Sequence, residues 1–146
     1  MKHNTAKKIT NWHQVEPANK EETILGAMIA WRKISDEKGR GVFALRDIKK
    51  DEVIEVCPVV PVGKNNFKSN GNAPDGYLFD WDADTKGEEH AMPLGYAMLY
   101  NHSKKPNMAM ECDMENYTIT ISANRDIKSG EELTWNYNCE LWFDEN

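Results

Sequence analysis

Short runs in which apolar and polar residues alternate occupy much of this chain of 146 residues. The alternation is clearest in residues 108–114 and 117–123, where the larger apolar side chains fall on every second position. A period of two is typical of a strand that buries one face. The two segments therefore predict an antiparallel hairpin that turns at Glu115 and Asn116.

Four other apolar runs predict strands, at residues 24–34, 40–45, 53–62 and 77–81. We expect the first to be buried, because it is almost continuously apolar. Pro58 and Pro61 confine the third to a sheet edge or a bent course, because proline has no N–H to donate. Residues 92–100 contain a proline and a glycine, so any helix there is short. Many short strands with little helix predict a mainly β architecture.

The chain is expected to form one domain, since its length allows one sizeable core and leaves little room for another. Residues 1–22 are polar and are interpreted as an N-terminal arm. Residues 23–146 are interpreted as the domain, including a short aromatic tail at its C-terminal end. Within it, residues 63–76 have the composition of a long surface loop.

One nine-residue pattern occurs twice: residues 44–52 read ALRDIKKDE and residues 123–131 read ANRDIKSGE. Each copy contains a strand end, the sequence Arg-Asp-Ile-Lys and a tight turn before the next strand. Two copies are too few for a solenoid, which needs at least three. The repeat therefore predicts one strand–turn–strand joint used at two places in the fold.

The formal net charge of −6 argues against a nucleic-acid backbone as the main partner. A net-negative surface instead favours encounters with basic proteins or peptides, although mild acidity is also common among ordinary proteins. No long apolar run predicts a signal peptide or a membrane span. The three cysteines, Cys57, Cys112 and Cys139, lie far apart and fit a reducing compartment. We expect a soluble intracellular protein.

Four stretches carry side chains suited to chemistry: KGRG at residues 38–41, YLFDW at 77–81, NHSKKPN at 101–107 and GEELTWNY at 130–137. Glycines one residue apart let a backbone approach a ligand closely, but no predicted helix follows to make a dinucleotide site. Asn101, His102 and Ser103 offer a mixed set of hydrogen-bond donors and acceptors. Each stretch taken alone also has a plain structural explanation as a turn or as core.

In this order and spacing, the four stretches resemble the SET methyltransferase family, from about residue 28 to residue 137. The chain looks most like the minimal viral and bacterial SET proteins, which lack cysteine-rich zinc modules. The resemblance implies a SET-domain (β-clip) fold of several small sheets, with a C-terminal pseudoknot and short helical turns. It also implies S-adenosyl-L-methionine as cofactor and a lysine ε-amine of a protein as substrate, such as a histone or histone-like basic tail.

The resemblance assigns roles to individual residues. It makes Tyr137 and Tyr77 catalytic, and it makes Trp135 and Tyr100 part of a substrate channel. Trp135 stands two residues before Tyr137, where family members often have the Phe or Tyr that tunes how many methyl groups are added. Residues implied to bind the cofactor are Lys38, Gly39, Arg40, Gly41, Tyr77, Asn101, His102, Tyr137 and Trp142. No metal site is implied.

Methyl transfer requires a neutral lysine amine in line with the methyl group that it attacks. A free lysine has a pKa near 10.4, so its deprotonation at neutral pH costs about 4–5 kcal/mol. A narrow aromatic channel disfavours the ammonium and lowers that pKa. Ordering the two reactants in line contributes several kcal/mol more.

Two readings compete with the enzyme. A non-catalytic SET-like binding or structural domain would keep the fold, but the intact Tyr137, Asn101 and His102 count against it. A metal protein using His90, His102, Cys112 and Cys139 is disfavoured by their irregular spacing. The resemblance also allows a homodimer that completes the substrate groove. It implies a cytoplasmic location, or a nuclear one in a eukaryotic host, with no membrane and no direct nucleic-acid contact.

Overall fold

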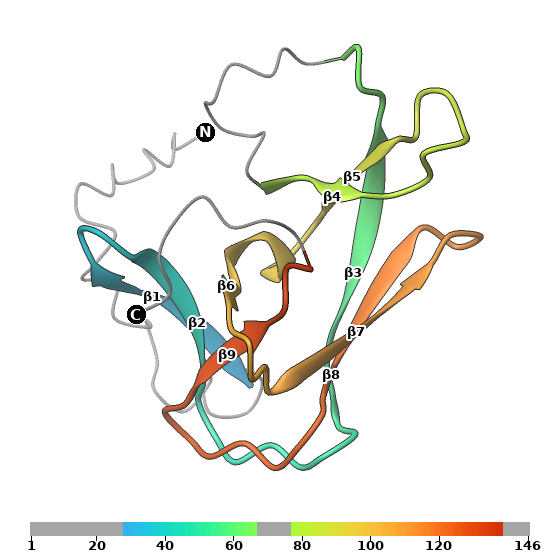
Figure 1. Ribbon diagram of the computed structural model, residues 1–146. Helices are drawn as coiled ribbons and strands as arrows, with labels where there is room; N and C mark the ends of the chain where they lie inside the picture. Colours follow the sequence, from blue (N-terminus) through green and yellow to red (C-terminus); the bar gives the residue numbers. More distant parts are fainter. Residues whose placement is uncertain (1–27, 67–76, 139–146) are drawn as a thin grey trace, which may run out of the picture.

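The computed structural model describes residues 28–66 and 77–138, which form two small curled sheets (Figure 1). The first has the strand order β1-β2-β9-β6. Its strands are β1 (Ile29–Ser35), β2 (Gly39–Ala44), β9 (Glu132–Trp135) and β6 (Asn101–His102). β1 and β2 form a hairpin, and β9 pairs antiparallel with β2 and parallel with β6. The late strand β9 thus runs beside the earlier residues 101 and 102, as in the predicted pseudoknot.

The second sheet has the strand order β4-β5-β3-β8-β7 and is antiparallel throughout. The hairpin of β7 and β8 confirms the strongest prediction from the alternation, and its inner face buries Ile119 and Ile121. The strands of this second sheet are β3 (Val53–Val62), β4 (Phe79–Asp80), β5 (His90–Pro93), β7 (Met108–Asp113) and β8 (Thr118–Ala123). The short helix expected before residue 100 is one 3₁₀ turn, η3 (Ala97–Leu99). The chain is mainly β, as predicted.

One expectation about strand placement is wrong in part, and another is wrong. β3 is an interior strand rather than an edge, because its first half pairs with β8 and its second half pairs with β5. Within the described part of the chain, each half therefore pairs with a neighbour on one side only. Pro58 and Pro61, which have no N–H to donate, are tolerated because the other side of each half is unpaired among the described strands. β1 is not buried along its length, since only Ile29 is fully covered and its last four residues are exposed. It is the outermost strand of its sheet, and residues 24–27 lie outside the described residues.

The nine-residue repeat forms a joint between the two sheets, which we call the clasp (residues 44–52 and 123–131). Ile48 and Ile127 exchange backbone hydrogen bonds of 2.9 Å in both directions, and both side chains are fully buried. The first copy carries the chain from β2 to β3, and the second carries it from β8 to β9. Figure 1 shows the two copies side by side at one end of the molecule. The predicted joint is confirmed.

The polar contacts of the clasp are reciprocal. Lys128 Nζ donates to Asp47 at 2.8 Å, and Lys49 Nζ donates to Asp126 at 3.1 Å. The backbone N–H of Ser129 also donates to Asp47, as that of Lys50 does to Asp126. Within each copy an arginine binds a glutamate, Arg46 to Glu52 and Arg125 to Glu131.

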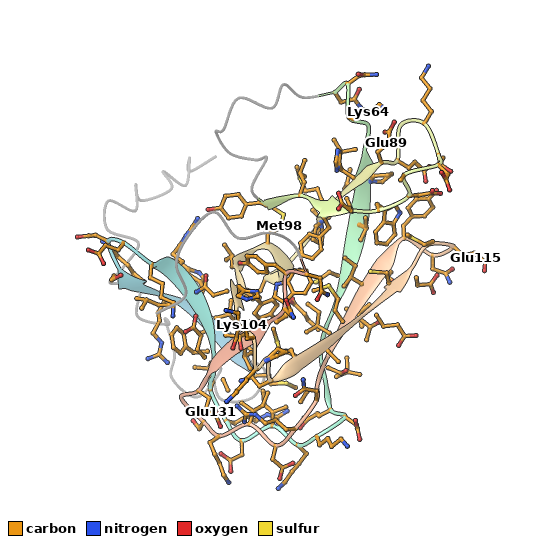
Figure 2. The ribbon with its side chains drawn as sticks, viewed as in Figure 1. Lys64, Glu89, Met98, Lys104, Glu115 and Glu131 are labelled. Carbon is orange, nitrogen blue, oxygen red and sulfur yellow. The ribbon has the colours of Figure 1, made fainter. Side chains whose placement is uncertain are left out.

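The clasp fixes β9 against β2, and so it determines where the residues after β9 lie. The backbone N–H of Ala44 donates to Glu131, and that of Gly130 donates to Ala44. Figure 2 places Glu131 at this end of the molecule and Lys64 and Glu89 at the other. No helix among the described residues is long and apolar enough to cross a membrane.

Candidate active site

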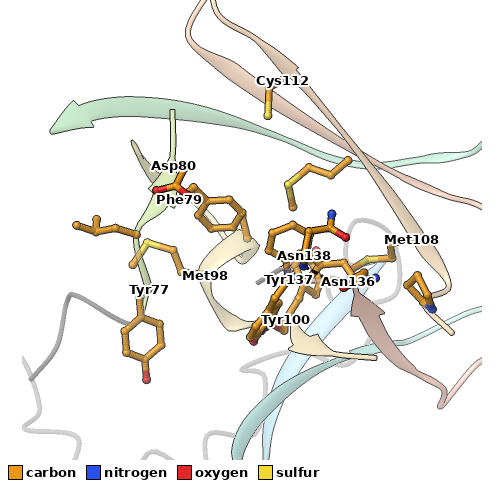
Figure 3. Close-up of a pocket in the computed structure, with 15 residues that line it drawn as sticks. Tyr77, Phe79, Asp80, Met98, Tyr100, Met108, Cys112, Asn136, Tyr137 and Asn138 are labelled. Carbon is orange, nitrogen blue, oxygen red and sulfur yellow. Dashed lines mark hydrogen bonds between the residues drawn. The ribbon is translucent and has the colours of Figure 1, made fainter. Parts of the chain in front are cut away.

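A pocket of about 560 Å³ opens between β4, η3, β7 and the residues that follow β9 (Figure 3). Aromatic and methionine side chains supply most of its wall. Among the described residues that line it, Asp80 is the single charged one. The lining residues are Tyr77, Leu78, Phe79, Asp80, Ala97, Met98, Tyr100, Pro106, Met108, Met110, Cys112, Trp135, Asn136, Tyr137 and Asn138.

Tyr137 is held in the pocket wall from both its backbone and its side chain. Its hydroxyl donates a hydrogen bond of 2.8 Å to the backbone carbonyl of Tyr100. Its backbone N–H donates to Nδ1 of His102 at 3.1 Å, and the two rings meet edge to face. Since Nδ1 accepts this bond, the neutral imidazole carries its proton on Nε2. The parallel pairing of β6 with β9 is what brings His102 to Tyr137.

Asn101 joins β6 to the glycine-containing hairpin strand β2. Its amide nitrogen donates to the carbonyl of Arg40 at 3.0 Å and to Oε1 of Glu132 at 2.6 Å. Gly41 is buried beneath these groups. A Cβ at Gly41 would lie 2.6 Å from Glu132 Oε1, 2.8 Å from Ile34 Cδ1 and 3.0 Å from Asn101 Nδ2, so these side-chain ends would have to move. The second glycine of KGRG therefore lets Glu132 and Asn101 pack closely against the backbone of β2.

The other residues of KGRG lie at the surface of the same corner. Gly39 has φ +73°, a left-handed conformation that favours glycine and lets the chain turn into β2. Lys38 Nζ lies 3.7 Å from Glu132 Oε2, and Arg40 is exposed. The amide of Asn107, 2% exposed, donates to the carbonyl of Glu132 and accepts from the N–H of Thr134. These two bonds fix the backbone of β9 at Glu132 and Thr134.

Trp135 and Tyr100 form the inner wall of the pocket. The ring of Trp135 stacks on Phe79 with a centroid distance of 5.1 Å and an interplanar angle of 11°, and it also contacts the ring of Tyr137. Tyr100 is 1% exposed, and its hydroxyl donates to Glu55 at 2.7 Å. Burial first, and then the negative charge of Glu55, raise the pKa of this phenol, so Tyr100 stays a neutral donor.

The sequence-predicted residues thus fall in two adjoining groups. At one corner Asn101 links the carbonyl of Arg40 to Glu132, beside Gly41. Tyr100, Trp135 and Tyr137 share the pocket, and His102 lies between the two groups. Tyr77 lines the pocket but lies at its rim, 40% exposed and apart from Tyr137 in Figure 3. Trp142 lies outside the described residues.

Sequence reasoning missed several residues of the site. Glu132, Asn107 and Phe79 stand inside the quoted motifs, so their position in those motifs was the available signal. Met98, Met108 and Met110 gave no such signal. The alternation predicts only that Met108 and Met110 share one face of their strand, and Met98 lies in the segment expected to form at most a short helix. No group of three or more His, Cys, Asp or Glu residues in the described part of the chain is arranged to hold a metal. Cys139 lies outside that part.

Comparison with known proteins decides the family. A model of the SET domain matches residues 39–138, which is more than half of the chain. The chain belongs to the SET domain family. It is 33% identical over 113 residues to the fission yeast (Schizosaccharomyces pombe) histone-lysine N-methyltransferase specific for H3 lysine-37, covering 76% of this chain and 74% of that protein. This SET protein is accordingly a protein-lysine methyltransferase.

Solved structures agree on the fold. A crystal structure of a Plasmodium falciparum protein described as a candidate histone methyltransferase is 31% identical, with a TM-score of 0.60. The match covers 81% of this SET protein and 99% of that chain. The complex ctPRC2, in an autoinhibited conformation bound to S-adenosylmethionine, gives a TM-score of 0.59 at 21% identity, over 77% of this chain and 15% of that one. At this identity the second likeness shows the fold alone.

Proposed function

We propose that this SET protein transfers a methyl group from S-adenosyl-L-methionine to the ε-amine of a lysine in a basic protein, with histone H3 as the first candidate. The observation that carries the proposal is the placement of the Tyr137 hydroxyl, 2.8 Å from the Tyr100 carbonyl in the wall of an aromatic pocket. The fission yeast relative is named for histone H3, and the net charge of −6 favours a basic partner.

The corner at Gly41 suits the amino-acid end of the cofactor. In the described part of the chain the amide nitrogen of Asn101 is bonded to protein acceptors, which leaves its Oδ1 as an acceptor for an outside amino group. Lys38, Gly39 and Arg40 supply backbone groups beside it, and His102 and Tyr137 continue the surface toward the pocket. When bound, the cofactor supplies a methyl group on a positively charged sulfur. Tyr77 and Trp142 remain proposed members of this site.

The chain's own residues prepare the lysine. The apolar and aromatic wall, including Trp135 and Tyr100, lowers the pKa of an entering amine, so that its proton leaves to solvent. The hydroxyl proton of Tyr137 points to the Tyr100 carbonyl, so the lone pairs of its oxygen can accept an N–H from the amine. The amine is thereby oriented without a strong base. Tyr137 is the proposed catalytic residue, and Tyr77 lies at the entrance.

The test is transfer of a labelled methyl group from S-adenosylmethionine to purified core histones, with wild type compared to Tyr137→Phe. We expect labelling of histone H3 that Tyr137→Phe greatly slows while calorimetry still detects cofactor binding. Gly41→Ala should instead weaken cofactor binding, because its Cβ would push against Glu132 Oε1 and so disturb the hydrogen bond that holds Asn101. No labelling and no cofactor binding by wild type would overturn the proposed methyl transfer and favour a non-catalytic SET-like domain.

A histone substrate implies a nuclear location in a eukaryotic host. Light scattering would show whether the protein forms the proposed homodimer.

A further inference from the structure

Glu55 of β3 contacts both ends of the turn that leads into the site. Its Oε2 accepts the backbone N–H of Tyr96 at 3.2 Å, at the start of η3. Its Oε1 accepts the hydroxyl of Tyr100 at 2.7 Å, at the end of η3. One carboxylate therefore spans the 3₁₀ turn and ties it to the interior strand of the five-stranded sheet. The proposed mechanism does not use this residue.

The surroundings of Glu55 are tightly packed. Tyr100 and Cys57 are each 1% exposed, and a Cβ on Gly95 would lie 2.9 Å from Glu55 Oε2 and 3.3 Å from Cys57 Sγ. Burial, followed by the charge of Glu55, raises the pKa of the Cys57 thiol to about 12, so Cys57 stays neutral. A charge-assisted hydrogen bond in such a site is stronger and more sharply directional than an exposed one. Tyr100 is accordingly fixed by Glu55 and not by packing alone.

The backbone of Tyr100 continues this contact to the pocket. Its carbonyl is the acceptor for the hydroxyl of Tyr137, so Glu55 acts on Tyr137 through one residue that both contact. We infer that Glu55 is a positioning residue for the methyl transfer: it holds Tyr100 so that the Tyr100 carbonyl orients the Tyr137 hydroxyl. This inference rests on the proposed function of Tyr137. Glu55 is not one of the described residues that line the pocket, and its side chain bonds Tyr96 and Tyr100 rather than Tyr137.

A carboxylate is suited to this position because both of its oxygens accept. Glutamine keeps the size of the side chain but provides one acceptor oxygen, so one of the two donors, Tyr96 N–H or Tyr100 O–H, loses its partner. Tyr100→Phe removes the link to Tyr100 and leaves the bond to Tyr96. These two variants therefore cut the same connection from opposite sides, with little change in volume. Glu115→Gln, at the exposed tip of the β7–β8 hairpin labelled in Figure 2, is the matched control.

The kinetic test uses the full chain with histone H3 and labelled S-adenosylmethionine. We expect Glu55→Gln and Tyr100→Phe each to lower kcat by about 10-fold, as for a modest misplacement of a reacting group. KM for histone H3 and the Kd of the cofactor should stay within about 2-fold of wild type, since Tyr100→Phe keeps the ring in the pocket wall and removes only the hydroxyl that bonds Glu55. The double variant should be no slower than the slower single one, because both break one connection. Multiplying losses, or a loss confined to KM or Kd, would overturn the inference.

A second readout does not depend on activity. The chain has five tyrosines, so ¹³C labelling of the ring carbon that bears the hydroxyl gives five resonances, assignable with Tyr→Phe variants. Glu55→Gln should shift the resonance of Tyr137 as well as that of Tyr100, and Glu115→Gln should shift neither. An unchanged Tyr137 resonance would overturn the positioning role even in an active enzyme. A shifted Tyr137 resonance in a protein that methylates nothing would uphold the link and refute the proposed function alone. Should Glu55→Gln fail to fold, Tyr100→Phe is read for Tyr137 in the same way.

Discussion

The clasp and the pocket are built in opposite ways from the same short strands. The clasp brings together two copies of one sequence pattern, and each lysine–aspartate or arginine–glutamate pair of one copy has its counterpart in the other. The pocket is assembled from single segments of β4, η3, β7 and the end of β9, and no segment repeats another. The clasp sets the position of β9, whereas the pocket uses the residues that β9 then presents. Changes in the two regions should therefore separate stability from activity.

The largest effect is expected in the pocket. Tyr137→Phe should lower kcat by about 10²–10³-fold, the size found when a polar group at the reacting atoms is removed. Its cost in stability should be about 1 kcal/mol, the worth of the hydrogen bond to the Tyr100 carbonyl. Tyr117→Phe is the matched control. It also removes a phenol hydrogen bond, the one to Glu88, but Tyr117 does not line the pocket. Histone methylation rates and urea unfolding check both variants, and equal losses of activity would contradict the separation.

The next largest effect is expected in the clasp. Ile127→Ala should destabilise the fold by about 2–4 kcal/mol, because it leaves a cavity where a fully buried side chain stood. Ile48→Ala should cost about the same, since the two isoleucines occupy equivalent places. The ion pairs around them are exposed and contribute little singly. Urea unfolding measures both costs. A kcat that falls at temperatures where the variants are still folded would show that the clasp also shapes the pocket.

Sequence reasoning predicted the clasp more completely than the pocket. The repeat was visible in the chain itself. The bounds of β3 followed from an apolar run, and the β7–β8 hairpin followed from alternation over a few residues. The interior place of β3 was not predictable in this way, because strand pairing depends on partners far along the chain. Glu55 shows the same limit, since it binds donors 41 and 45 residues away. In the pocket, Tyr137 was predicted from the family resemblance and not from a local pattern.

A smaller effect concerns pH and the carboxylates of the clasp. The hydrogen bond from Lys128 holds the pKa of Asp47 below its usual value, and the backbone N–H of Lys50 does the same for the pKa of Asp126. A carboxylate with a lowered pKa in the folded state stabilises the fold at pH values above its pKa in the unfolded chain, which is near 4. This stabilisation is lost as the pH falls further. Asp47→Asn and Asp126→Asn should therefore lower Tm at neutral pH. The difference from wild type should shrink on acidification to about pH 3. If the difference in Tm between variant and wild type did not change with pH, the charge of these carboxylates would not be its cause.

The smallest effect distinguishes the two copies of the clasp from each other. Asp51 and Gly130 occupy equivalent turn positions, and both have left-handed backbones, with φ of +66° and +90°. A Cβ at Gly130 would meet no atom within 4 Å, so Gly130→Ala tests backbone strain alone and should cost about 1 kcal/mol. Asp51→Gly should relieve that strain and change stability by less than about 0.5 kcal/mol, since glycine also gains freedom in the unfolded chain. Urea unfolding of both variants measures this difference. The two costs should differ because aspartate tolerates a left-handed backbone and alanine does not. If Gly130→Ala and Asp51→Gly cost the same free energy of unfolding, the two turns are not equivalent.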